Sequence, residues 1–147
     1  MKKIDLLKKI EEAKIKQKAG NSLEANQIFQ VLLKSNNDSF DLLYAYALFC
    51  RDLKNFNLAK KVFLNLINKF PSSINPYILL AEILKIENKF KDAEGILLKA
   101  IKIDPNHGDL LYNFSLLCFA LRNFDNALEY IDKAIKLSIN NDIYKLL

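Results

Sequence analysis

The chain has 147 residues, of which 51% are hydrophobic and 27% are charged, and its formal net charge is +5. A chain of this length and hydrophobicity can bury a sizeable core, which excludes an intrinsically disordered protein. Glycine and proline contribute three residues each, too few for a collagen-like chain or a turn-rich β domain. The positive charge is concentrated in the N-terminal half, where residues 1–39 and 40–73 each carry +3.

Apolar residues spaced at i, i+3, i+4 and i+7 predict amphipathic helices along the whole chain. In chain order, the predicted helices cover residues 4–19, 22–35, 39–53, 56–69, 74–88, 90–103, 107–121 and 124–138, and residues 142–147 begin a further one. No segment has the composition of a linker, so we expect a single domain over residues 1–147. The predicted fold class is all-α.

A constant period, about 34 residues long, runs through these helices. Alanine recurs once per period, at Ala25, Ala59, Ala93 and Ala127. Four residues after each alanine stand Phe29, Phe63, Leu97 and Ile131, and seven after it stand Leu32, Leu66, Ala100 and Ala134. Pro71 and Pro105 are separated by the same interval. Such a period indicates stacked helix pairs, because one pair alone cannot bury its apolar face.

The second to fourth units resemble the tetratricopeptide repeat, a helix–turn–helix unit of the same length. The residues that carry the resemblance are Leu43, Tyr46, Ala47, Cys50, Ala59, Phe63, Leu66 and Pro71, then Tyr77, Leu80, Ala81, Leu84, Ala93, Leu97, Ala100 and Pro105, then Leu111, Phe114, Ser115, Cys118, Ala127, Ile131 and Ala134. Ile139 stands where the fourth unit would have its proline. The first unit is more polar, with Lys9, Glu12 and Lys16 at apolar positions, as in a terminal capping repeat.

The resemblance implies a TPR-like α-solenoid, a right-handed superhelical stack of antiparallel helix pairs. About four repeats are expected, at residues 6–39, 40–73, 74–107 and 108–141. It also implies a non-catalytic scaffold for protein–protein interaction, which binds a peptide or partner segment in a concave groove lined by the first helix of each repeat.

The residues themselves argue against an enzyme and against a cofactor or metal site. The only histidine, His107, falls in the turn before Gly108 and reads as a residue of the turn or helix start. No glycine-rich phosphate loop is present. Cys50 and Cys118 occupy equivalent core positions two repeats apart, too far for a disulfide, and read as buried thiols.

The expected groove consists of residues on the first helices that lie outside the core register. The predicted partner-binding residues are Ile10, Lys14, Tyr44, Leu48, Arg51, Ile78, Glu82, Lys85, Tyr112, Leu116 and Phe119. Their tyrosine, leucine and isoleucine side chains predict an apolar floor, and exposed aromatic residues are typical of anchor sites. The basic N-terminal half favours an acidic segment as the partner.

Other partners are disfavoured. The carboxylate clamp of co-chaperone repeats would fall on Ile10, Lys14, Ala45, Asn75 and Leu79, or on Tyr44, Leu48, Leu79, Asp109 and Asn113, and neither set is a clamp. We therefore expect no binding of chaperone C-terminal tails. Lysines alternate with acidic residues along the helix faces, as on an ordinary solvated surface, which argues against nucleic acid as a partner. No apolar run is long enough to span a membrane and no secretory signal is present, so we expect a cytoplasmic protein.

Two alternatives remain open at this stage. Residues 16–33 are similar to the opening repeat of bacterial proteins that continue into glycosyltransferase or methyltransferase domains, so the chain could be an N-terminal accessory or targeting module of a larger enzyme. At the other end, Ile143, Tyr144, Leu146 and Leu147 predict an apolar start of a short helix. We expect either a homodimer through this end or a native chain that continues beyond it.

Overall fold

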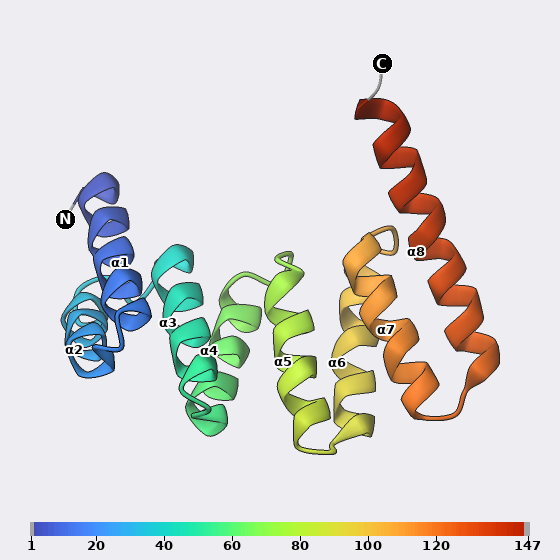
Figure 1. Ribbon diagram of the computed structural model, residues 1–147, viewed down its shortest axis with the longest axis horizontal. Coiled ribbons are helices and arrows are strands. Elements are labelled where there is room, and N and C mark those ends of the chain that lie inside the picture. The colour runs from blue at the N-terminus through green and yellow to red at the C-terminus, as the bar shows by residue number, and fades with distance from the viewer. Residues whose placement is uncertain (1, 146–147) are drawn as a thin grey trace. The chain divides into compact units, whose positions relative to one another are not determined.

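The computed structural model describes the backbone of residues 2–145 and the side chains of residues 2–139. These residues form eight α-helices and no strand (Figure 1), which confirms the expected all-α class. The helices are α1 (Lys3–Lys18), α2 (Ser22–Leu33), α3 (Phe40–Asp52), α4 (Phe56–Lys69), α5 (Asn75–Ile86), α6 (Phe90–Ile103), α7 (Gly108–Ala120) and α8 (Phe124–Lys145). The first seven agree with the predicted helices to within two residues at each end.

The eighth helix differs from the prediction. We expected it to end at residue 138 and a further helix to begin at residue 142, but α8 continues as one helix of 22 residues to Lys145. Residues 138–141 contain neither glycine nor proline, and Ile139 replaces the proline that would stop the helix, so nothing interrupts it there. The side chains of the expected apolar terminus, Ile143, Tyr144, Leu146 and Leu147, lie outside the described ones.

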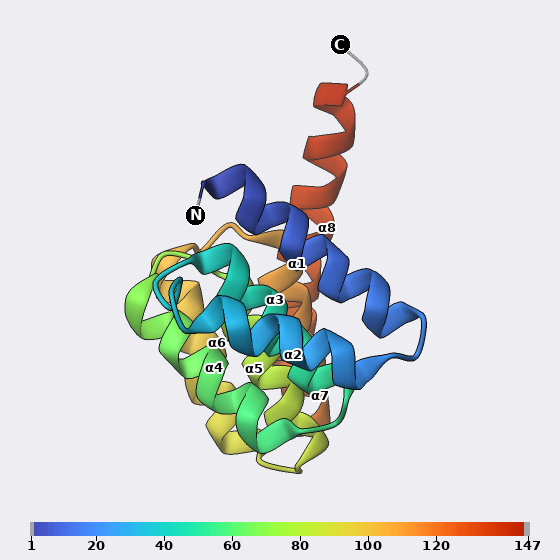
Figure 2. The same ribbon diagram turned by 90° about the vertical axis from the view of Figure 1, so that its left-hand side faces the viewer.

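Consecutive helices pack as pairs, α1 with α2, α3 with α4, α5 with α6, and α7 with α8. The chain divides into two compact units, Met1–Pro71 and Ser72–Leu147, and each unit contains two of these pairs. In the first unit, α3 packs on both α1 and α2 (Figure 2). In the second unit, α7 packs on α6. Each unit is therefore an α-solenoid segment in which one helix pair stacks on the next.

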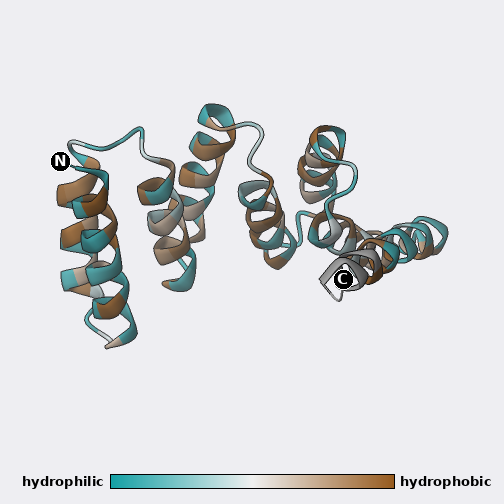
Figure 3. Ribbon diagram, turned by 90° about the horizontal axis from the view of Figure 1, so that it is seen from above, coloured by the Kyte–Doolittle hydropathy of each residue, from teal (hydrophilic) through white to brown (hydrophobic). Residues whose placement is uncertain are grey.

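The core follows the repeat register. Ala25, Ala59 and Ala93 are fully buried at the close contacts between helices, and the larger side chains of Phe29, Phe63 and Leu97 four residues later are fully buried beside them. Small residues let two helix backbones approach, and the large residues fill the remaining space. Each helix carries both hydrophilic and hydrophobic residues (Figure 3).

The turn inside each helix pair has the same backbone geometry in all four pairs. Its central residue has a positive φ, and these residues are Gly20 (83°), Lys54 (58°), Asn88 (60°) and Arg122 (60°). The next amide N–H donates to the carbonyl five residues earlier, as in Asn21 to Lys16 at 2.9 Å and Asn55 to Cys50 at 2.9 Å. This pair of features is a Schellman motif, which satisfies the last carbonyls of the first helix. The repeat is thus a period of the backbone as well as of the side chains.

Candidate functional site

Two of the predicted partner-binding residues in the first unit line a common pocket. Lys14 of α1 and Leu48 of α3 occupy equivalent positions of successive repeats, and both face a pocket of about 310 Å³. The other residues that line it are Gln17, Lys18, Ala45 and Asp52. We refer to these six residues as the α1/α3 site. It combines an apolar side chain with two lysines.

The acidic group of the α1/α3 site is already paired within the protein. Arg51 donates from Nη2 to Asp52 Oδ1 at 2.8 Å, and Gln17 donates from Nε2 to Asp52 Oδ2 at 3.2 Å. Lys14 Nζ lies 3.5 Å from Glu11 Oε2, a half-exposed pair of a kind that contributes little and exchanges readily with other anions. The site can therefore offer lysine charge to a carboxylate while the negative charge of Asp52 is compensated by Arg51.

Besides Arg51, which pairs with Asp52, the remaining predicted residues of the first unit are Ile10 and Tyr44. Ile10 is only 3% exposed, so its expected place on an exposed face is wrong. It lies four residues after Leu6 and three before Ala13, which places it on the buried face of α1. Tyr44 is half-buried and stacks on Phe40, with ring centroids 5.5 Å apart. Its ring therefore stabilises α3 as well as offering surface.

In the second unit the predicted residues do not form one continuous row. Ile78 is 7% exposed and belongs to the buried face of α5, so its expected exposure is also wrong. Glu82 and Lys85 are half-buried on the same helix. Tyr112 on α7 is exposed and lines a different pocket from its neighbours Leu116 and Phe119.

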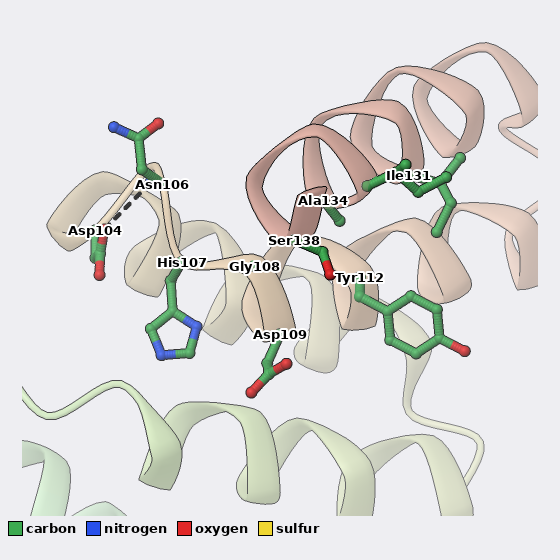
Figure 4. A pocket seen from close by; sticks show the side chains of 10 residues that line it. Asp104, Asn106, His107, Gly108, Asp109, Tyr112, Ile131, Ala134 and Ser138 are labelled. Carbon is green, nitrogen blue, oxygen red and sulfur yellow. Dashed lines mark hydrogen bonds between the residues drawn. The ribbon is translucent and has the colours of Figure 1, made fainter. Parts of the chain in front are cut away.

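The pocket beside Tyr112 is the larger of these two, at about 650 Å³ (Figure 4). The α6–α7 turn and the first turn of α7 form one side, and Ala134 and Ser138 of α8 form the other. His107 is the N-cap of α7, and its Nδ1 accepts a hydrogen bond from the Leu110 amide at 3.3 Å. That contact bears out the sequence interpretation of His107 as a helix-start residue. Across the described residues, no group of His, Cys, Asp and Glu is arranged to hold a metal ion.

Leu116 and Phe119 line an apolar pocket of about 360 Å³ between α7 and α8. Its other residues include Phe124, Leu128 and Ile131 of α8. The rings of Phe119 and Phe124 meet edge to face with centroids 5.5 Å apart, yet Phe119 remains 64% exposed and Leu128 67% exposed. These five residues, together with Ile135 and Ile139 further along α8, are named the α7/α8 apolar face.

Leu128 and Ile135 were not among the predicted partner-binding residues, although the sequence carries a signal for Leu128. In the repeat register, the position of Leu128 is occupied by Asn26, Lys60 and Glu94 in the other units. A leucine at a position that is otherwise polar marks a surface whose surroundings differ in the fourth unit. Lys18 and Asp52 were also missed, because their contribution depends on how α1 and α3 pack.

A fourth pocket, of about 530 Å³, lies between α2, α3 and the start of α4. Tyr46 and Cys50 form part of its wall, and the Tyr46 hydroxyl accepts a hydrogen bond from Gln30 Nε2 at 2.8 Å. Burial raises the pKa of the Tyr46 hydroxyl and of the Cys50 thiol. A raised thiol pKa keeps Cys50 protonated at neutral pH, so this cysteine is a poor nucleophile. Both cysteines are buried and free, as expected.

Among the described residues, no helix combines the length and the apolar character needed to cross a membrane.

The fold and the repeated turn define a helical-repeat protein. The family model of the tetratricopeptide repeat matches residues 74–107 and 108–141, so the second unit contains two tetratricopeptide repeats, and the suspected relation to that family is confirmed. Repeats of this family typically form non-catalytic scaffolds for protein interaction.

Solved structures of MamA share this fold. The chain superposes on "Crystal structure of MamA" with a TM-score of 0.81 and 15% identity, over 95% of this chain and 81% of that one. It superposes on MamA from Desulfovibrio magneticus RS-1 with a TM-score of 0.77 and 18% identity, over 95% of this chain and 79% of that one. The TM-scores show a common fold, and at identities this low the likeness shows the fold alone. None of the curated proteins matches the sequence of this chain.

Proposed function

We propose that this chain is a non-catalytic protein-interaction scaffold that binds an extended peptide segment of its partner at the α1/α3 site. The observation that carries the proposal is the shared pocket of Lys14 and Leu48, equivalent positions on successive first helices. A pocket of about 310 Å³ suits a peptide side chain, and it is too small for a whole helix. An apolar contact beside a lysine selects a peptide with an apolar anchor next to an acidic residue.

The charge of the first unit supports an acidic ligand. Residues 1–71 contain 13 Lys and Arg against 7 Asp and Glu, a net charge of +6, whereas residues 72–147 contain 9 against 10, a net charge of −1. A basic surface attracts an acidic segment before contact and raises its association rate. Binding should therefore weaken as ionic strength rises, because salt screens exposed charges.

The test uses fluorescence anisotropy with three labelled peptides of equal length. The first is acidic with one leucine, the second has serine in place of the leucine, and the third has lysines in place of the acidic residues. We expect only the first to bind well. Leu48→Asn should weaken its binding, and so should the double variant Lys14→Glu with Lys18→Glu, each by about tenfold, which corresponds to about 1.4 kcal/mol.

The matched control is Lys34→Glu with Lys61→Glu, which changes the charge of the first unit equally at exposed positions outside the α1/α3 site. This control should retain most of the binding. Equal losses in the two double variants would mean that net charge alone attracts the peptide, and the proposed site would then be wrong.

A further inference from the structure

A row of apolar side chains runs along one face of α8. Its members are Phe124, Leu128, Ile131, Ile135 and Ile139, and all except the half-buried Ile131 are exposed. Successive members are four, three, four and four residues apart, close to the alternating spacing with which paired helices meet. Leu116 and Phe119 of α7 widen the row at its N-terminal end. Exposed apolar surface of this extent marks an interaction site.

The same unit shows what kind of element such a face accepts. In the repeat register, Ile131 corresponds to Leu97 of α6, and α6 is covered by α7. Leu97 is fully buried there, whereas Ile131 is not. The face of α8 is therefore a helix-packing surface, and four of the five members of its row remain exposed.

The first helix of another copy does not fit this surface. The helices α3 and α7, which stack on a preceding pair, have buried leucines at one register position, Leu42 and Leu110. The equivalent residue of α1 is Lys8, which is exposed, as are Lys9 and Glu12. Head-to-tail stacking of two copies would bury these charged groups, which is unfavourable without partners.

The charges of α8 match a second α8 in the opposite direction. Asp125, Glu129, Asp132 and Lys136 are four, three and four residues apart, so they form one flank beside the apolar row. The acidic residues lie in the first part of this flank, and Lys136 lies at its end. Glu129 is already paired with Lys133 on the same helix at 2.6 Å, so Asp125 and Asp132 supply the acidic charge that faces a partner. When two such helices run antiparallel, the acidic part of one faces the basic end of the other. In a parallel pair this flank would face the opposite flank of the partner helix, so Asp132 would not meet Lys136.

We propose that the α7/α8 apolar face is a dimer interface, in which the α8 helices of two copies of this chain pack antiparallel about a two-fold axis. A pairing with Ile131 opposite Ile135 brings Asp132 of each copy towards Lys136 of the other. The C-terminal part of one α8 then lies over the Leu116–Phe119 end of the other copy's face. The interface is self-complementary, as a two-fold dimer requires.

The test is the mass of the whole chain in solution, measured by light scattering over a range of concentrations. The monomer has a mass of 17.0 kDa, and we expect twice that mass. Leu128→Glu and Ile135→Glu should each weaken dimerisation at least tenfold. The control, Leu23→Glu, replaces a comparably exposed leucine of the first unit and should leave the dimer intact. Circular dichroism of each variant verifies that the helices are retained.

Charge reversal tests the antiparallel arrangement. Asp132→Lys alone and Lys136→Glu alone should each weaken dimerisation about threefold or more, because each opposes like charges. The two variants mixed together, and the double variant alone, should regain the affinity of the original chain. A monomer up to millimolar concentration, assemblies larger than a dimer, or a double variant that stays weakened would overturn the proposal. The peptide site lies in the other unit, so Leu128→Glu should leave peptide binding unchanged, and the two proposals fail independently.

Discussion

Ala93 illustrates how one small side chain fixes the distance between two helices. It is fully buried in the α5/α6 pair and lies in register with Ala25, Ala59 and Ala127. A larger residue at this point would push the helix backbones apart or force neighbouring side chains out of their preferred rotamers. The alanine is therefore set by packing.

Ala93→Leu should lower the free energy of unfolding by about 1–3 kcal/mol through overpacking. The measurement is urea denaturation followed by circular dichroism. Lys99→Leu, which adds a leucine at an exposed position of the same helix, is the control and should change stability by no more than about 0.5 kcal/mol. An unchanged midpoint for Ala93→Leu would show that the assigned register is incorrect.

The buried thiols should make stability depend on alkaline pH. Burial raises the pKa of both Cys50 and Cys118 above its ordinary value, so the folded state favours the protonated thiols. The contribution of the protonated thiols to the free energy of unfolding is complete below the unfolded thiol pKa of about 8.5. It is lost as the pH rises through the pKa values of the folded state. Urea titrations from pH 7 to pH 10 should show a steeper loss for the original chain than for Cys50→Ala with Cys118→Ala. Parallel curves would contradict this assignment.

At the scale of the element, the four turns with positive φ are the clearest common feature. Only the first has glycine, and the others place Lys54, Asn88 and Arg122 in the left-handed region. Glycine adopts this region without a Cβ penalty, so it is the residue most compatible with a Schellman turn. The three other turns are imposed by the packing of the helices that they connect.

Gly20→Ala should therefore destabilise the protein by about 1 kcal/mol, and Lys54→Gly should stabilise it by up to about the same amount. No atom lies within 4 Å of a Cβ built on Gly20, so the cost comes from the backbone alone. Gly95→Ala is the matched control, because Gly95 lies inside α6 and its added Cβ also meets no atom. That substitution should raise stability by about 1 kcal/mol. In thermal unfolding, the melting temperature should fall for Gly20→Ala and rise for Lys54→Gly and Gly95→Ala. A change in the opposite direction would contradict this account of the turn.

For the whole molecule, the two compact units and their different charges are the main features. The first unit is strongly basic and carries the α1/α3 site, and the second is slightly acidic and carries the α7/α8 apolar face. Stacked repeats contact only their neighbours, so stability is close to a sum over pairs and their interfaces. Loss of one pair should therefore weaken the chain gradually.

Deletion of residues 108–147 should lower the denaturation midpoint while the remaining helices are retained. The reason is that α7 covers α6, so its removal exposes Leu97 and its neighbours but leaves the pairs α1/α2, α3/α4 and α5/α6 complete. Far-ultraviolet circular dichroism should show nearly the same helix content per residue as the intact chain. Complete loss of helical signal would argue against additive repeats.

The sequence by itself was sufficient for the fold class, for seven helices and for the core alanines. These features depend on local periodicity and on residues that start or stop helices, both of which can be read along the chain. The extension of α8 was missed because the repeat pattern places the helix end near residue 139, although Ile139 there does not stop a helix. Tertiary structure decided which side chains reach a surface. Ile10 and Ile78 share a register with Tyr112, yet both are buried and Tyr112 is exposed, because exposure depends on the helices packed around each residue.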